Sequence, residues 1–301
     1  MRRTPARRLL PHLARTARRL SPAVALCLVA TVAGALLHGT GRARPAGVCS
    51  RGWDRIASVP DASAPDGERR VWIHHPAGTD RADLPVLYLL HGYPGDPEAT
   101  LNDQVGALDA AMCRTGVPFV VAAPDGRAGT WDTEWGDDAS GRFALESFLT
   151  GPVIQQTEGN HRRSARLRAI AGFSMGGYGA AVLALRHPDL YSQVASFGGY
   201  FHADDPDGVF GADSPAHAPD RLVSDVTSRQ LRFFLVEGAD EDTPLTVGSI
   251  HGEADRFAAI LTRHSVNVTV VHPPGGHGPD GWYPAVSDCV AFLNAGWRRG
   301  Q

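Results

Sequence analysis

The chain has 301 residues, 43% of them hydrophobic, and its formal net charge at pH 7 is −3. This length and apolar content are sufficient for the buried core of one α/β domain. All 29 basic residues are arginine, and the lack of lysine excludes Schiff-base lysine enzymes, pyridoxal-phosphate sites and Walker A nucleotide sites.

The first 46 residues differ in composition from the rest of the chain. They contain nine arginines and no acidic residue, and an apolar stretch from Ala23 to Leu37 follows the basic residues. This order is typical of an export signal, and the stretch is shorter than the roughly 20 residues that span a bilayer. We therefore expect a signal peptide or membrane tether plus linker over residues 1–46, and an exported domain over residues 47–301. No clean cleavage site follows the stretch, so a cleaved signal and an uncleaved tether remain alternatives.

The charge and cysteine content of the remainder limit its partners and its covalent structure. Beyond residue 46 there are 20 arginines and 32 acidic residues, a formal charge of −12, which argues against a nucleic-acid partner. Three cysteines lie outside the apolar stretch. In an exported protein, a disulfide between Cys49 and Cys113 is expected, whereas Cys289 is predicted to be a buried small hydrophobe on a C-terminal helix.

Strand-like and helix-like segments alternate after an irregular, Pro- and Gly-rich lead-in over residues 42–68. The pattern predicts strands over 70–75, 86–90, 119–123, 167–171, 194–197, 231–236 and 268–272. It predicts helices over 103–113, 143–156, 176–186, 254–263 and 285–297. Apolar strands separated by helices indicate a single α/β domain, with a mostly parallel central sheet and helices on both faces. Residues 199–225 are predicted to be an irregular excursion rather than a further strand and helix.

The most informative motif is Gly-Phe-Ser-Met-Gly-Gly at residues 172–177. It lies between a predicted strand and a predicted helix of small residues, where Ser174 would occupy a sharp nucleophile elbow. Gly172 and Gly176 leave room for the backbone to double back. The motif therefore predicts Ser174 as a catalytic nucleophile.

A serine nucleophile requires a base and an orienting acid, in the chain order serine, acid, histidine. His277 lies in a Gly/Pro loop directly after the last predicted strand and is the predicted base. The acid should follow the preceding strand, where Asp240, Glu241 and Asp242 are adjacent. Asp242 is the first choice because the following Thr-Pro suits a loop that turns back toward the histidine, while Asp240 and Glu241 remain open.

The oxyanion hole is expected to consist of two backbone amides. One is that of Met175, directly after the nucleophile. The second is that of Tyr93, in the loop His91-Gly92-Tyr93-Pro94-Gly95 that follows the strand predicted over residues 86–90. His91 is interpreted as a side chain that stabilises this loop rather than as a second base.

Several further residues have both a functional and a structural interpretation. Trp131 and Trp135 could line a lipid or sugar cleft, or could serve only to pack a loop. His74 and His75 are adjacent on a predicted strand, so their side chains point to opposite faces and cannot hold one metal ion together. The acidic turn at residues 240–242 lacks the regular oxygen spacing of a cation site.

The chain resembles the esterase D/antigen 85 branch of the α/β-hydrolase superfamily over roughly residues 69–297. The resemblance is carried by Leu-His-Gly-Tyr at 90–93, Pro-Asp-Gly at 124–126, Glu-Ser-Phe-Leu at 146–149 and the serine block with the following Arg-His-Pro-Asp-Leu-Tyr at 186–191. It continues in Gly-Gly-His at 275–277 and Trp282. The resemblance implies a serine hydrolase or acyltransferase that works through an acyl-enzyme, with no cofactor and no metal.

The sequence is consistent with three functions. The first is an exported esterase acting on small-molecule, lipid or carbohydrate esters through Ser174, His277 and Asp242. The second is a cell-envelope acyltransferase, similar to mycolyltransferases, that uses the same triad with an alcohol as acceptor. The third is a noncatalytic binding protein on a hydrolase scaffold.

Overall fold

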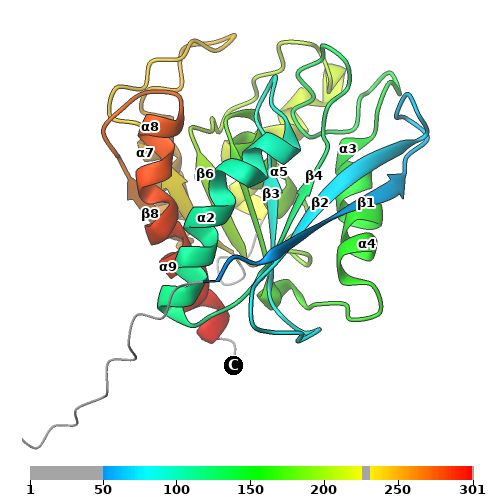
Figure 1. Ribbon diagram of the computed structural model, residues 1–301. Coiled ribbons are helices and arrows are strands. Elements are labelled where there is room, and N and C mark those ends of the chain that lie inside the picture. The colour runs from blue at the N-terminus through cyan, green and yellow to red at the C-terminus, as the bar shows by residue number, and fades with distance from the viewer. Residues whose placement is uncertain (1–49, 226–230, 300–301) are drawn as a thin grey trace, which may run out of the picture. The chain divides into compact units, whose positions relative to one another are not determined.

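The computed structural model describes residues 50–225 and 231–299. Eight strands in this part of the chain form one sheet, in the order β1-β2-β4-β3-β5-β6-β7-β8 (Figure 1). The strands are β1 (Trp53–Pro60), β2 (Glu68–His75), β3 (Val86–Leu90), β4 (Val120–Pro124), β5 (Arg168–Phe173), β6 (Gln193–Phe197), β7 (Arg232–Val236) and β8 (Asn267–Val271).

The sheet is parallel from β4 through β8, whereas β1 pairs antiparallel with β2 and β2 pairs antiparallel with β4. The central strands β3, β4, β5 and β6 are buried along their whole length. Continuous burial is expected where helices cover both faces of a parallel sheet. The predicted mostly parallel α/β fold is therefore confirmed.

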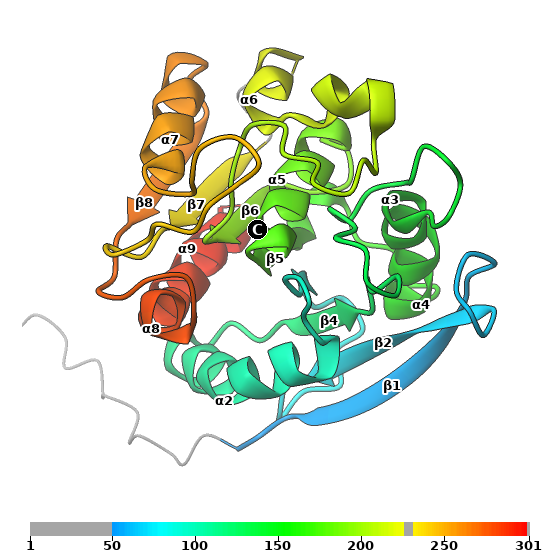
Figure 2. The same ribbon diagram turned by 90° about the horizontal axis from the view of Figure 1, so that it is seen from above.

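Helices lie on both sides of the sheet in the view from above (Figure 2). They are α2 (Pro97–Thr115), α3 (Leu145–Phe148), α4 (Ile154–Glu158), α5 (Met175–Arg186), α6 (Pro219–Leu222), α7 (Glu253–Arg263), α8 (Pro279–Trp282) and α9 (Val286–Arg298). Helices α2 and α9 pack on one face, and α5 and α7 pack on the other.

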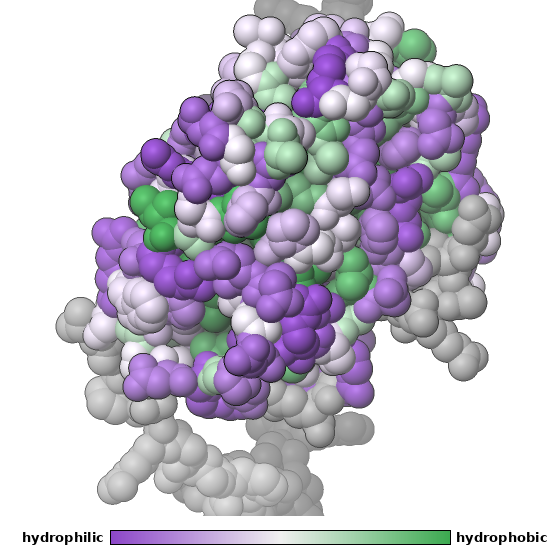
Figure 3. Space-filling model, turned by 90° about the vertical axis from the view of Figure 1, so that its right-hand side faces the viewer, coloured by the Kyte–Doolittle hydropathy of each residue, from purple (hydrophilic) through white to green (hydrophobic). Residues whose placement is uncertain are grey.

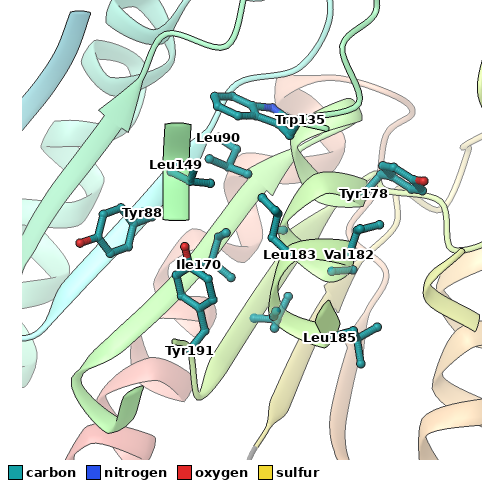
Figure 4. Packing of buried hydrophobic residues seen from close by; sticks show 14 of the residues in the cluster. Tyr88, Leu90, Trp135, Leu149, Ile170, Tyr178, Val182, Leu183, Leu185 and Tyr191 are labelled. Carbon is teal, nitrogen blue, oxygen red and sulfur yellow. The ribbon is translucent and has the colours of Figure 1, made fainter. Parts of the chain in front are cut away.

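Alternate side chains of each central strand enter two separate cores. Tyr88, Leu90 and Ile170 join the core under α5, where Figure 4 shows them facing Leu183 and Tyr191. Leu87, Leu89 and Ala171, on the opposite face of the same strands, join the core under α2 and α9. Because side chains alternate between the two faces, each central strand is packed on both sides. The loops that leave the carboxyl ends of these strands therefore start from well-packed positions.

Two predicted elements differ in detail from the structure. Helix α2 begins six residues before the predicted start, because the Asp96 carboxylate caps the helix by accepting the Ala99 amide at 2.9 Å and proline occupies the first turn. The helix predicted over residues 143–156 is α3, a π-helical segment (Leu149–Val153) and α4 in succession. Pro152 lacks the amide proton that a regular α-helical turn would use.

The irregular lead-in predicted over residues 42–68 is wrong for its second half, which contains β1. Only Ala57 and Val59 of this edge strand are buried, so the segment has a weak apolar pattern. The predicted excursion over residues 199–225 is confirmed, since its described part contains 3-10 turns and α6 but no strand.

The predicted N-terminal signal lies outside the described residues. No helix in residues 50–225 or 231–299 is long and apolar enough to cross a membrane. Cys49 also lies outside them, so its pairing with Cys113 stays a prediction. Cys289 is a free, buried cysteine on α9, as predicted, and burial raises the pKa of its thiol to about 12.

Candidate active site

Ser174 lies at the sharp turn between β5 and α5, at the carboxyl end of the sheet. Its backbone has φ +54° and ψ −121°, a left-handed conformation that residues other than glycine rarely adopt. A Cβ atom on Gly172 would lie 2.2 Å from the Gly176 carbonyl oxygen, and one on Gly176 would lie 2.4 Å from that of Leu90. Glycine is therefore required on both sides of the serine, as the strand-turn-helix prediction assumed.

A hydrogen-bonded chain of three side chains starts at Ser174. His277 Nε2 lies 2.8 Å from Ser174 Oγ, and His277 Nδ1 lies 2.8 Å from Glu241 Oε2. His277 comes from the loop after β8 and Glu241 from the loop after β7, so the carboxyl ends of three parallel strands supply the three groups. The ring of Trp282 meets the His277 ring edge to face at 4.9 Å and limits its movement.

The structure corrects the expected acid: the carboxylate paired with His277 is that of Glu241 and not that of Asp242. The chain after β7 turns tightly, because the Glu241 amide donates to the Gly238 carbonyl and the Asp240 amide donates to that of Gly275. The turn directs Glu241 inward, where its residue is 1% exposed, and leaves Asp240 and Asp242 on the surface.

Hydrogen bonds hold the Glu241 carboxylate in its ionised form. Burial acts to raise the pKa of this carboxyl, but the hydrogen bonds from His277 and Thr243 outweigh burial, and the pKa lies below its ordinary value. The Thr243 amide donates to Oε1 at 3.0 Å, which leaves Oε2 for His277. A carboxylate so placed keeps the proton of the imidazole on Nδ1, and Nε2 is then free to accept the serine proton. Thr243 was not among the residues singled out from the sequence.

The loop after β3 packs against the elbow. A Cβ atom on Gly92 would lie 2.9 Å from the Phe173 carbonyl oxygen and 3.2 Å from Ser174 Cβ. The adjacent Tyr93 is therefore close to the serine, and its hydroxyl donates to the Thr130 carbonyl at 2.8 Å. Met175 begins α5, where the first amides have no intrahelical acceptor. The Tyr93 and Met175 amides remain the predicted oxyanion hole.

His91 stabilises this loop, as the sequence suggested. Its Nδ1 lies 2.8 Å from the Gly92 carbonyl oxygen, and its Nε2 accepts the Gly126 amide at 2.9 Å. Burial lowers the pKa of His91, so the ring is neutral with its proton on Nδ1. Both ring nitrogens are occupied, which leaves His91 no means of acting as a second base.

The two tryptophans of residues 131–135 occupy different environments. Trp135 is fully buried in the core and donates from Nε1 to the His91 carbonyl at 3.1 Å, so a role for its side chain in lining a cleft is excluded. Trp131 is exposed, and the Arg142 guanidinium lies 3.7 Å from its ring centroid.

The remaining candidates for a metal site do not form one. His74 is buried on the α2 face, with Nδ1 2.7 Å from Asp54 and Nε2 3.0 Å from Asp109. His75 faces the other side of the sheet and stacks on Trp53. Within the described ranges, no group of three or more His, Cys, Asp or Glu residues could hold a metal ion.

A protein of the α/β-hydrolase class is defined by three features together: the sheet order, the strained serine and the hydrogen bonds that link Ser174 to His277 and His277 to Glu241. The chain belongs to the esterase family: the family model described as "Putative esterase" matches residues 62–292. The expected resemblance to the esterase D/antigen 85 branch is thereby confirmed.

Individual relatives agree with this assignment over part of their length. The chain is 32% identical over 123 residues to Esterase Rv1288 of Mycobacterium tuberculosis, a match that covers 40% of this chain and 26% of that protein. It is 28% identical over 135 residues to the diacylglycerol acyltransferase/mycolyltransferase Ag85A of Mycobacterium leprae, covering 43% and 39%. The chain thus matches about a quarter of the length of the first relative.

A solved structure extends the likeness to most of the chain. A ferulic acid esterase superposes with a TM-score of 0.68 at 19% identity, covering 82% of this chain and 99% of its own. At this identity the likeness establishes the fold.

Proposed function

We propose that the protein is a serine esterase that cleaves carboxylic esters through Ser174, His277 and Glu241. The observation that carries this proposal is the hydrogen-bonded chain from Ser174 Oγ through both ring nitrogens of His277 to Glu241, with 2.8 Å at each step. Membership of the esterase family supports it.

The residues present are sufficient for a two-step acyl transfer. Ser174 Oγ attacks the ester carbonyl carbon while its proton passes to His277 Nε2, and the Tyr93 and Met175 amides stabilise the oxyanion. His277 then returns the proton to the departing alcohol oxygen, which leaves an acyl-enzyme on Ser174. Water, deprotonated by His277, releases the acid and restores the serine. Glu241 remains ionised throughout and stabilises the imidazolium.

An acyltransferase is the second candidate, and the similarity to the diacylglycerol acyltransferase/mycolyltransferase Ag85A favours it. The acyl-enzyme would be the same, but the hydroxyl of an alcohol would replace water in the second step. The arrangement of Ser174, His277 and Glu241 serves both acceptors equally.

The export signal predicted over residues 1–46 and the Cys49–Cys113 disulfide belong to this proposal. An exported enzyme would meet its ester substrates outside the cytoplasm, where disulfides persist. Fractionation of producing cells, with N-terminal sequencing of the mature protein, tests export and distinguishes a cleaved signal from a tether.

A series of p-nitrophenyl esters from acetate to palmitate tests the chemistry, with and without glycerol or a disaccharide as acceptor. An esterase releases p-nitrophenol and free acid at equal rates whether or not acceptor is present. An acyltransferase forms a new ester with the acceptor, detected by mass spectrometry. If the folded protein neither turns over any ester nor forms an acyl-enzyme, the noncatalytic binding scaffold replaces both proposals.

A further inference from the structure

A hollow lies at the opposite end of the sheet from Ser174. It has a volume of about 290 Å³ and is framed by the starts of β1 and β4, the β2–β3 loop and the segment after α4. Ser174 lies at the carboxyl end of β5, whereas this hollow is lined by residues at or before the amino ends of β3 and β4, Leu84 and Val120. Its volume is at the lower end of the range for small-molecule sites and suits a single six-membered ring.

One wall of the hollow is a fixed aromatic surface. Trp53, the first residue of β1, is paired across the strands with His75 at the end of β2. The two rings stack with centroids 4.1 Å apart and planes inclined by 10°. Trp53 is nevertheless 54% exposed, so the stack holds the indole in one orientation while much of its surface stays open. An exposed, immobilised tryptophan is a ready platform for an apolar face of a ligand.

Charged groups of both signs line the hollow. Arg81 makes two hydrogen bonds to Asp83, at 3.0 and 2.9 Å. Arg163 donates to the backbone carbonyls of Leu84, at 3.0 Å, and His161, at 2.6 Å. Asp80 adds a further negative charge to the lining. An anion would meet the carboxylates of Asp80 and Glu158 as well as the guanidinium groups of Arg81 and Arg163, whereas a neutral ligand with many hydroxyls meets both donors and acceptors.

The walls also contain two buried polar atoms without a hydrogen-bond partner in the described part of the chain, His75 Nε2 and Thr157 Oγ1. Burial, and next the positive charge of Arg55, lower the pKa of His75, so the ring is neutral at pH 7. Buried polar atoms are normally satisfied, and these two belong to residues that line the same hollow. Either atom has unused hydrogen-bonding capacity that a ligand hydroxyl could satisfy.

The side of the molecule that carries β1 and α4 favours a small polar ligand over a protein partner. Its hydrophobic residues form separate patches between hydrophilic ones (Figure 3). A stable protein interface usually has a continuous buried core of apolar and aromatic residues.

We propose that this hollow is a carbohydrate-binding site that takes one neutral sugar ring, stacked on Trp53 and hydrogen-bonded to the polar walls. A pyranose presents apolar C–H groups on its faces and hydroxyls around its rim, which matches an indole platform beside mixed donors and acceptors. The site is separate from Ser174 and would hold a glycan-bearing surface or substrate near the enzyme. It does not rest on the proposed esterase activity.

Saturation-transfer NMR on the full-length protein tests the proposal with methyl glucoside, methyl xyloside and cellotetraose, and with inorganic phosphate in a parallel ³¹P titration. We expect the sugars to receive saturation and phosphate to show no binding. Trp53→Ala should abolish the sugar signals. Ile56→Ala is the matched control, because Ile56 lies on the same strand, is 56% exposed and points to the other face of the sheet.

Two further variants test the role of the polar wall and the independence of the site from Ser174. Thr157→Val, which conserves the shape of the side chain, should weaken sugar binding without changing the melting temperature. Ser174→Ala should leave sugar binding unchanged. Binding of phosphate alone would overturn the proposal in favour of an anion site. Absence of sugar signals at millimolar concentrations, or equal signals from wild type and Trp53→Ala, would overturn it outright.

Discussion

Replacing Glu241 by glutamine should abolish most of the activity, because the surrounding hydrogen bonds dictate how the new amide is oriented. The Thr243 amide donates to Oε1 at 3.0 Å, so the amide oxygen of glutamine must occupy that position. The NH2 group then takes the place of Oε2, 2.8 Å from His277 Nδ1. Nδ1 must then accept a hydrogen bond from this NH2 group, so the ring proton moves to Nε2. Protonated Nε2 can no longer take the proton of Ser174.

The expected loss in kcat/KM is about 10⁴-fold, or roughly 5.5 kcal/mol in the activation free energy, the size of effect seen when the orienting carboxylate of a serine protease becomes an amide. Initial rates with p-nitrophenyl butyrate, measured beside thermal melting curves, provide the test. Asp242→Asn is the matched control, since this neighbouring carboxylate is exposed, and its rate should stay close to that of wild type. A large loss in Asp242→Asn with little change in Glu241→Gln would mean that Glu241 is not the carboxylate that orients His277.

The remaining predictions concern the room for a Cβ atom at two glycines and the pH dependence of the free energy of unfolding. Gly176→Ala places a Cβ atom 2.4 Å from a backbone carbonyl oxygen, so activity and the free energy of unfolding should both fall, by roughly 3 kcal/mol for the latter. Gly106→Ala, on the exposed face of α2 with no atom within 4 Å, should instead stabilise by about 0.5–1 kcal/mol in urea unfolding. Burial raises the pKa of Asp132 from 3.8 to about 7, so the folded state holds this proton more tightly and loses stability as pH rises between these values, by at most roughly 4 kcal/mol. Asp132→Asn should therefore stabilise the protein more at pH 8 than at pH 4, and an equal gain at both would contradict the assignment.

The sequence predicted the parallel core and two of the three site side chains because strong local signals mark them. The glycines around Ser174 and the Gly/Pro loop around His277 indicate turns independently of contacts with distant parts of the chain. The continuous apolar strands β3 to β6 are similarly distinctive. These features depend on a few neighbouring residues, which is the information that a single sequence carries best.

The parts that could not be predicted depend on long-range contacts. Three adjacent carboxylates compete for His277, and the choice of Glu241 follows from a hydrogen bond between the Asp240 amide and the Gly275 carbonyl, on a different loop. Strand β1 was missed because only Ala57 and Val59 reach the core, while its pairing with β2 supplies the remaining stabilisation.

Mass spectrometry of the full-length protein after reaction with a fluorophosphonate tests directly whether Ser174 is the nucleophile. The account predicts a single covalent adduct, located on Ser174 by peptide mapping. The adduct should be absent in Ser174→Ala, and it should form far more slowly in Glu241→Gln, with the melting temperature of each variant measured as the control for folding. Absence of an adduct on the folded wild type, or the same adduct in Ser174→Ala, would contradict the account.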